Sequence, residues 1–388
     1  MTHHEKTQRV LDHAVAEYGV PGIVVEVADE HGTWFGAAGV ADLDTGRPRE
    51  RGEHLNFGSI GKSYTAAAVL ALTAEGKLDL DDTVDKWLPG AADAHGNDGR
   101  KLTVRSLLNH TSGLFATGLA TRTAGRFIRS RWEKHRFDVW TVDELVKLAV
   151  SEPPVAEPGE TFMYSNGGYY LLGAIIEAAT GRTHAEEVHR TVIEPLGLTD
   201  TYVRPAEETK YPDPHPRAYS KVFLREGVDP ARVTPENWPS LMEDPGLPPL
   251  DVTEMNTSLG HAAGGIVSTT ADMLRFYTAL LRGTLLPPEQ HARMWATVST
   301  EGGSWLPNSR YGLGVHEETL PGGLVLRGGA GSDAGTCSYL RGTPDAKHLV
   351  VIHTNNDWCT FGVFAEILAA ESGRNHRECV RRFPRRRA

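Results

Sequence analysis

The sequence predicts an α+β sandwich: a mostly antiparallel five-stranded sheet flanked by terminal helices, with a largely helical region inserted between its two halves. Two observations indicate this class. Short β-like runs lie near both ends of the 388-residue chain, and the segments between them carry helical apolar spacing. We therefore expect one α/β region from residues 1–82 and 258–388, one helical region from residues 83–257, and a cleft where they meet.

The N-terminal part predicts a helix followed by a hairpin. Helical spacing covers residues 7–17, and two β-rich runs follow at residues 22–28 and 33–40. The residues between these runs, 29–32, have the polar and glycine composition of a turn. The chain then leads to Ser59.

The C-terminal part predicts the other three strands and a closing helix. The β-like runs are residues 323–327, 335–340 and 348–354, and residues 361–371 have helical spacing. Since the two chain ends supply two and three strands, the sheet is expected to join them.

The middle of the chain predicts helices and one long irregular segment. Helical spacing occurs at residues 104–108, 142–150, 168–180, 184–193 and 271–281. Proline is dense in the loop 205–249, which excludes one regular element there. Such a loop is either a lid or binding loop or a floppy surface insertion, and the sequence leaves both open.

Composition and charge narrow the class of protein. The chain has 40 Lys+Arg against 50 Asp+Glu, a net charge of −10, which argues against a general nucleic-acid partner. No apolar run is long enough for a membrane span, and residues 1–22 lack the pattern of a secretory signal. The three cysteines, Cys337, Cys359 and Cys379, do not form a disulfide framework. These features predict a cytoplasmic protein without membrane or nucleic-acid partners.

Ser59 and Lys62 form the first chemical signal, because they lie three residues apart at the start of an apolar run. On a helix this spacing places both side chains on one face, so the amine reaches the hydroxyl. Tyr164 and Asn166 form the second signal, since two residues apart on an extended segment project the same way. A nucleophile, a base, a phenol and an amide make a plausible acyl-transfer site.

Four further stretches accompany these motifs along the chain: residues 76–82, 107–114, 263–272 and 311–314. With them, the chain resembles the serine β-lactamase and penicillin-binding protein superfamily, in the branch of class C β-lactamases, D,D-carboxypeptidases, D-amino-acid peptidases and esterases. The resemblance implies a β-lactamase/transpeptidase-like fold and no cofactor or metal. His110, inside one of these stretches, is expected to make structural hydrogen bonds.

The resemblance also implies a role for each site residue. Ser59 attacks a carbonyl, Lys62 accepts its proton, Tyr164 shuttles a proton to the leaving group, and Asn166 holds Lys62 and the substrate. Whether Lys62 or Tyr164 is the acting base stays open at this point. The backbone amides of Ser59 and Ser332 are expected to form the oxyanion hole.

The third motif of the superfamily departs from its pattern here. Where a strand normally carries Lys-Thr-Gly or His-x-Gly, this chain has Gly329, Ala330 and Gly331. We expect these three residues to bind substrate through their backbone. Arg327 lies two residues before Gly329 and therefore on the same face of the predicted strand. It either restores the lost positive charge or is a solvent-facing arginine at a strand end. The basic segment 121–136 is expected to be a solvated helix face rather than a contact for an anionic substrate.

The predicted function is that of a serine hydrolase or acyltransferase acting on an amide, peptide or ester through an acyl-Ser59 intermediate. The expected partner is an intracellular small-molecule acyl donor, with an amine acceptor if the enzyme is a transacylase of natural-product biosynthesis. The sequence is also compatible with a β-lactamase or D,D-carboxypeptidase, and with a non-catalytic binding protein that kept the fold. It predicts neither the substrate's identity nor the oligomeric state.

Overall fold

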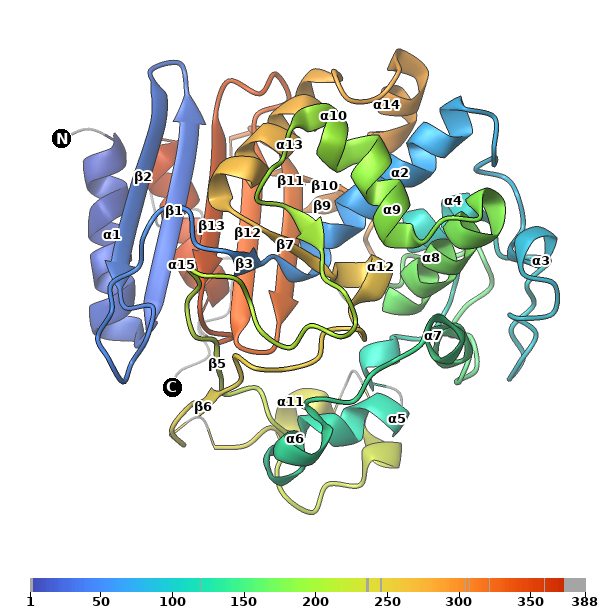
Figure 1. The fold of residues 1–388 in the computed structure, drawn as a ribbon, viewed down its shortest axis with the longest axis horizontal. Coiled ribbons are helices and arrows are strands. Elements are labelled where there is room, and N and C mark those ends of the chain that lie inside the picture. Colours follow the sequence, from blue (N-terminus) through green and yellow to red (C-terminus); the bar gives the residue numbers. More distant parts are fainter. Residues whose placement is uncertain are drawn as a thin grey trace.

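The computed structural model describes residues 3–119, 121–234, 237–244, 246–303, 305–306, 308–320, 322–358 and 360–372. Within this part of the chain, the main sheet has eight antiparallel strands in the order β2-β1-β13-β12-β11-β10-β9-β8 (Figure 1). The strands are β1 (Gly22–Asp29), β2 (Gly32–Gly39), β8 (Val298–Ser299), β9 (Ser309–Tyr311), β10 (His316–Thr319), β11 (Val325–Asp333), β12 (Thr336–Gly342) and β13 (Leu349–Thr354).

The α+β class is confirmed, but the prediction of five strands is wrong. The three missed strands, β8, β9 and β10, are two to four residues long, too short to show an alternating pattern. Strand β11 also runs six residues further than the predicted 323–327, because the glycines at 328, 329 and 331 were taken as the end of the strand. β1 pairs with β13, which joins the two chain ends in one sheet.

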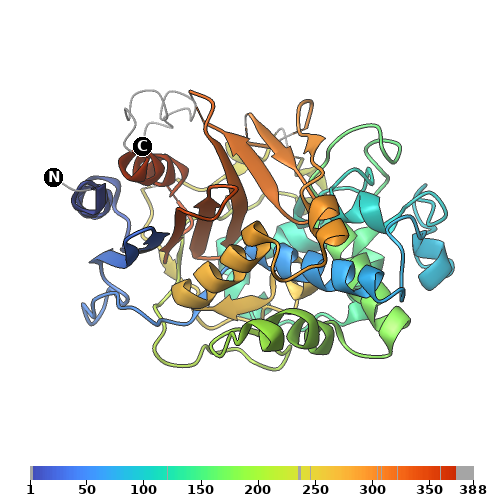
Figure 2. The ribbon, with the colours of Figure 1, turned by 90° about the horizontal axis from the view of Figure 1, so that it is seen from above.

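The two faces of the sheet bury different helices (Figure 2). Helices α1 (His3–Tyr18) and α15 (Thr360–Glu371) cover one face, and α13 (Thr270–Arg282) and α2 (Gly61–Ala74) lie against the other. The alternation of β1 explains this arrangement: Ile23, Val25 and Val27 pack toward the terminal helices, whereas Val24 packs into the cluster that contains α2 and α13. Each fully buried side chain of this kind contributes about 1.5–3 kcal/mol.

The rest of the chain is mainly helical. Its larger helices are α4 (Val104–Leu108), α6 (Arg129–His135), α7 (Val142–Ala149), α8 (Asn166–Thr180), α9 (His184–Val188) with the π-turn His189–Ile193, and α14 (Pro288–Met294). Short helices are α3 (Val84–Trp87), α5 (Thr121–Ala124), α10 (Glu194–Leu196), α11 (Trp238–Leu241) and α12 (His261–Gly264). The helices predicted from apolar spacing are all present. None of the described helices has the length and apolar character needed to span a membrane.

Two small sheets connect the helical part to the main sheet. One contains β3 (Leu55–Asn56), β7 (Ile266–Ser268) and β4 (Tyr202–Val203), and the other pairs β5 (Tyr219–Ser220) with β6 (Leu250–Asp251). Strand β3 leads directly into the turn that carries Ser59. Its pairing with β7 therefore anchors the chain immediately before the candidate nucleophile.

The proline-rich loop 205–249 is packed rather than floppy where the structure describes it. Phe223 and Leu224 are buried, and the Leu224 amide donates a 2.6 Å hydrogen bond to the Phe127 carbonyl. Pro235 and Pro245 lie outside the described residues. The described part of the loop thus closes over α5 and α6 instead of projecting into solvent. Cys337 is a buried free thiol, and Cys359 and Cys379 lie outside the described residues.

Candidate active site

Ser59 lies in the short 3₁₀ turn η1 (Gly58–Ile60), between β3 and α2. Gly58 has a φ of +51°, a left-handed conformation that favours glycine. Its amide donates a 2.9 Å hydrogen bond to Asn56 Oδ1, which closes the turn. The local sequence therefore presents Ser59 at the N-terminal end of α2, a helix whose next residues are buried.

Lys62 lies one helical turn after Ser59 and is almost completely buried, with 1% exposure. Its Nζ is 3.1 Å from Ser59 Oγ, 2.7 Å from Asn166 Oδ1 and 2.7 Å from the Ala263 carbonyl oxygen. Burial lowers the pKa of Lys62 well below its ordinary value of 10.5, because desolvation penalises the ammonium form.

The three partners of Lys62 fit a neutral amine. A neutral amine has two N–H donors and one lone pair. Asn166 Oδ1 and the Ala263 carbonyl accept the two N–H bonds, which leaves the lone pair directed to the Ser59 hydroxyl. With a neutral amine, the Ser59 hydroxyl donates this 3.1 Å hydrogen bond to Lys62 Nζ, as a general base requires, whereas an ammonium would donate it to Ser59 Oγ.

Asn166 is placed by the start of α8. Ser165 caps this helix, since its Oγ accepts the Gly167 amide at 3.1 Å and donates to the Phe115 carbonyl at 2.6 Å. The Ser165 amide donates to His110 Nδ1 at 3.3 Å. The structure thus shows the hydrogen-bonding role expected for His110.

Tyr164 lies between two rings. The His110 ring is 4.2 Å away and the indole of Trp305 stacks on it at 4.6 Å. Lys62 Nζ is 4.9 Å from the centre of the Tyr164 ring. Burial raises the pKa of Tyr164, and a hydrogen bond with Ser59 opposes this only in part. The phenol is therefore protonated at neutral pH and close to both Ser59 and Lys62.

Strand β11 passes directly beside the nucleophile turn. A Cβ atom at Gly331 would overlap the Phe57 carbonyl oxygen and lie 2.9 Å from the Ser59 amide nitrogen. A Cβ at Gly58 would likewise lie 3.0 Å from the Ser332 amide nitrogen. Two glycines are thus needed for the close approach of these backbones.

The pairing of β11 directs the Ser332 amide away from β12. Asp333 and Thr336 close a two-residue hairpin turn, so they form a hydrogen-bonded pair. Pairs alternate in an antiparallel ladder, which makes Ser332 and Cys337 a pair without mutual hydrogen bonds. On the other side, β10 pairs with β11 only as far as Gly328. The Ser332 amide is therefore left for a ligand beside Ser59.

The other residues predicted on this strand do not reach the cavity wall. Ala330 packs against the cluster under the terminal helices, and a Cβ at Gly329 would collide with the Tyr277 hydroxyl. Arg327 is paired with Glu317 at 3.0 Å and lies over the Trp295 ring at 4.7 Å. At about 3.3 Å per strand residue it is some 16 Å from Ser332 along β11. The structure therefore places Arg327, Gly329 and Ala330 away from the cavity and gives only Gly331 a position next to Ser59.

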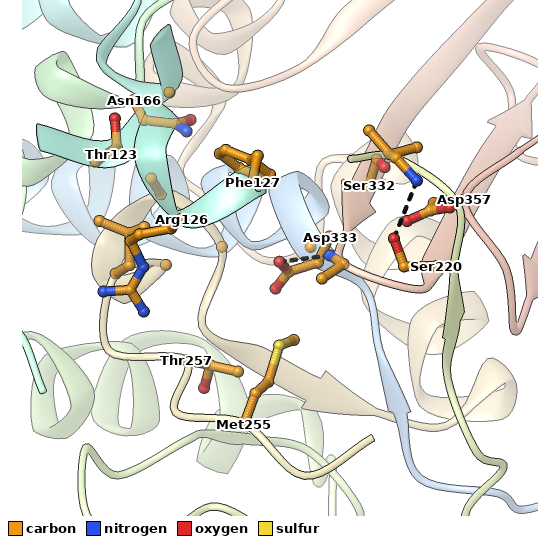
Figure 3. Close-up of a pocket in the computed structure, with 18 of the residues that line it drawn as sticks. Thr123, Arg126, Phe127, Asn166, Ser220, Met255, Thr257, Ser332, Asp333 and Asp357 are labelled. Carbon is orange, nitrogen blue, oxygen red and sulfur yellow. Dashed lines mark hydrogen bonds between the residues drawn. The ribbon is translucent and has the colours of Figure 1, made fainter. Parts of the chain in front are cut away.

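Ser59 lines a cavity of about 320 Å³, and Figure 3 shows other residues of its wall. Its wall contains Ser59 and Asn166, Arg126 and Trp132 from the basic segment, and the hairpin residues Ser332 and Asp333, with the further residues Phe127, Phe223, Met255, Thr257 and Asp357 among others. The expected solvated face thus describes only part of the basic segment, since Trp132 is buried and Arg126 lines the cavity.

Sequence reasoning missed most of this wall. Its members come from segments far apart in the chain, and no local spacing connects them. Asp333 was missed as well, although its position directly after Ser332 is a local signal that could have indicated it. Among the described residues, no group of three or more His, Cys, Asp or Glu side chains is arranged to hold a metal ion.

The α+β fold with a serine and a buried lysine at the N-terminal end of α2 defines the β-lactamase/transpeptidase class of protein. The Beta-lactamase family profile matches residues 7–375. The chain therefore belongs to the Beta-lactamase family.

Individual relatives agree with this assignment. A solved D-stereospecific amidohydrolase from Streptomyces sp. is 36% identical, with a TM-score of 0.81 over 95% of this chain and 98% of that one. Penicillin-binding protein 4* of Bacillus subtilis is 34% identical over 42% of this chain, and esterase EstB of Burkholderia gladioli is 33% identical over 57% of it. The aligned parts span only 34% and 57% of those two relatives.

Proposed function

We propose that the protein is a serine hydrolase that cleaves an amide or ester through an acyl-Ser59 intermediate. One observation carries this proposal: the buried Nζ of Lys62 lies 3.1 Å from Ser59 Oγ, and its two other hydrogen-bond partners are neutral oxygens. A serine hydroxyl becomes a useful nucleophile when a neighbouring base takes its proton. Burial keeps Lys62 available as that base.

In the acylation step, Ser59 Oγ bonds to the substrate carbonyl carbon while its proton moves to Lys62 Nζ. The carbonyl oxygen becomes an oxyanion, which the amides of Ser59 and Ser332 stabilise by hydrogen bonds. Tyr164 then gives its proton to the leaving nitrogen or oxygen as the carbon–leaving group bond breaks, and Lys62 returns a proton to Tyr164. In deacylation a water molecule attacks the ester, the protons move in reverse, and Ser59 is restored.

The two pKa shifts support Lys62 as the acting base. Burial lowers the pKa of Lys62, which favours its neutral form, and raises the pKa of Tyr164, which favours the phenol. A neutral amine is suited to accept the Ser59 proton, and a phenol is suited to donate one to the leaving group.

Two names among the relatives support esters and amides as substrates, namely an esterase and an amidohydrolase. A β-lactamase or carboxypeptidase function is less well supported, because Gly329, Ala330 and Gly331 carry no cation for a substrate carboxylate. Arg327 does not replace it, since it is paired with Glu317. Transfer to an amine instead of water stays a second outcome open to the same intermediate.

Hydrolysis of a neutral p-nitrophenyl ester tests the proposal. Ser59→Ala is expected to lose at least about 10³-fold in kcat/KM, as other serine nucleophiles do. Ser63→Ala is the matched control, because Ser63 is on the same helix but bonds to the Gly314 carbonyl and Tyr277 hydroxyl. Full activity in Ser59→Ala would contradict the proposal, and the absence of turnover and of labelling in the wild type would favour a binding protein.

A further inference from the structure

Tyr164 does not line the cavity beside Ser59. The described wall of this cavity includes Ser59, Asn166 and Ser332. In the proposed mechanism Tyr164 protonates the leaving group, so the leaving group lies on the Tyr164 side. The cavity therefore receives the acyl part of the substrate, the part that stays attached to Ser59.

Asp333 places a carboxylate in this acyl cavity, immediately after the Ser332 amide that faces the oxyanion. Its Oδ2 accepts a 2.9 Å hydrogen bond from Asn56 Nδ2, and Asn56 Oδ1 in turn accepts the Gly58 amide. Its Oδ1 accepts the Ala334 amide at 2.8 Å. Asp333 is thus fixed to the nucleophile turn through a single asparagine side chain, and Figure 3 shows its carboxylate directed toward the middle of the cavity.

The charge of Asp333 is not balanced by an ion pair within the described residues. Its two hydrogen-bond donors are neutral, and burial raises its pKa. Arg204 acts on it only as a more distant charge and is stacked on the Tyr211 ring at 4.0 Å. A recessed carboxylate with only neutral donors gains from a cation that enters the cavity. Each oxygen keeps a further lone pair for such a ligand.

Arg126 in the opposite wall differs in this respect. Its guanidinium is paired with Asp138 at 3.2 Å and donates to the His135 carbonyl at 2.7 Å. Its charge is therefore already compensated. Arg136, also in the wall, is paired with Glu133 at 3.1 Å. Phe127, Trp132 and Met255 add apolar surface. The wall also holds Asp357, whose carboxylate accepts the Lys221 and Gly335 backbone amides at 3.0 Å. Asp333 is the carboxylate that follows Ser332 directly, beside the reacting carbonyl.

We propose that Asp333 binds the ammonium group of an acyl donor that carries an amine on the carbon next to its carbonyl. The substrate class is then the amides and esters of apolar amino acids, including peptides with a free N-terminus. This inference rests on the proposed function, since it places the ammonium relative to the acyl-Ser59 bond. The absence of a cation at Gly329 to Gly331 agrees with it, because a lysine there would repel an ammonium group.

A pair of substrates tests this proposal. Phenylalanine p-nitroanilide, each enantiomer separately, is compared with 3-phenylpropanoyl p-nitroanilide, which lacks only the amine. We expect the wild type to prefer one amine-bearing substrate by at least about tenfold in kcat/KM, the size of a charge-assisted hydrogen bond. Asp333→Asn, which keeps the shape of the side chain, should reduce that ratio at least about tenfold. The ratio of two substrates on one preparation does not depend on how much of the variant is folded.

Asp345→Asn is the matched control, because Asp345 is an exposed carboxylate in the turn between β12 and β13 and should leave the ratio unchanged. A wild type without preference for either amine-bearing substrate, or an unchanged ratio in Asp333→Asn, would overturn the proposal. Hydrolysis of a neutral p-nitrophenyl ester distinguishes failure of the proposed Asp333 role from failure of the proposed serine hydrolase function. If Ser59-dependent ester turnover is present and the amine preference is not, only the role of Asp333 fails.

Discussion

The two sides of the cleft approach the same substrate carbonyl with different parts of the chain. The nucleophile side uses side chains: Ser59, Lys62 and Asn166 meet within 3.1 Å. The β11 side uses backbone, since Gly331 is required by the contact with Phe57 and Ser59, and the Ser332 amide is left free of β12 by strand alternation. Catalysis should therefore depend on the functional groups of the side chains on the nucleophile side. On the β11 side it should depend on how closely the strand backbone approaches the nucleophile turn.

Of the substitutions considered below, Lys62→Met should lower kcat/KM the most. The variant keeps the length of the side chain but has no base, so kcat/KM should fall by at least about 10³-fold. In the wild type, kcat/KM should rise with pH through the lowered pKa of Lys62, because only the neutral amine accepts the Ser59 proton. A pH–rate profile of a neutral ester measures both. Lys77→Met, at an exposed lysine beyond α2, is the control.

The same variant should be more stable than the wild type. The folded-state pKa of Lys62 is below the unfolded value of 10.5, so unfolding takes up a proton between these two values. Below pH 10.5 Lys62 opposes folding, because the folded state keeps its amine neutral while the unfolded state binds a proton. This contribution makes the wild type less stable as pH falls from 10.5 toward the folded-state pKa. Thermal melts across pH should show this Lys62-dependent slope in the wild type only. A Lys62→Met variant less stable at neutral pH would contradict the account.

Tyr164→Phe should have a smaller effect that depends on the leaving group. Loss of a general acid costs about 10²–10⁴-fold where the leaving group needs a proton. A p-nitroanilide needs one, whereas p-nitrophenolate leaves readily without it. We therefore expect a large loss on the anilide and a loss at least about tenfold smaller on the ester. Equal losses on both substrates would assign Tyr164 to positioning instead of proton transfer.

Gly331→Ala tests the strand side, where no functional side chain is removed. The new Cβ would overlap the Phe57 carbonyl oxygen and push β11 from the nucleophile turn. Misplacement by about 1 Å costs as much as 10²-fold, so we expect a loss of about 10- to 100-fold in kcat. Gly362→Ala is the control, because open space surrounds that glycine on α15. Wild-type kcat in Gly331→Ala would show that the close approach does not matter.

Arg327→Gln should have the smallest effect. Arg327 is partly exposed, pairs with Glu317 and covers Trp295, away from the cavity. We expect kcat/KM to change by less than about threefold and the free energy of unfolding by at most about 1 kcal/mol. Steady-state kinetics and chemical denaturation measure these values. A large rise in KM without loss of stability would restore Arg327 as a substrate contact.

The contrast between the nucleophile side and the β11 side also explains which parts of the site could be predicted from the sequence. The nucleophile side depends on short spacings, three residues from Ser59 to Lys62 and two from Tyr164 to Asn166, and local geometry turns these into shared faces. Terminal strands and helices were predictable for the same reason, since their apolar periods extend over several residues. Strands β8, β9 and β10 were not, because their pairing comes from tertiary contacts.

The cavity wall was beyond local reasoning. Arg126, Met255 and Asp357 come from three distant segments, so only the folded chain brings them together. Strand alternation predicted that Arg327 shares a face with Gly329 and left open whether it contacts substrate or solvent. In the structure Arg327 does share the face of Gly329 and Gly331 on β11. Alternation gives the face and not the distance along the strand, which is why the pairing with Glu317 could not be anticipated.

The central claim is that Ser59 carries the acyl group during turnover, and rapid quenching followed by peptide mass spectrometry tests it most directly. The wild type would be mixed with a p-nitrophenyl ester, quenched in acid within the first turnovers and digested. The account predicts the mass of one acyl group on the peptide that contains Ser59, and no such adduct in Ser59→Ala. Turnover with the acyl group on another residue, or an adduct that persists in Ser59→Ala, would contradict it.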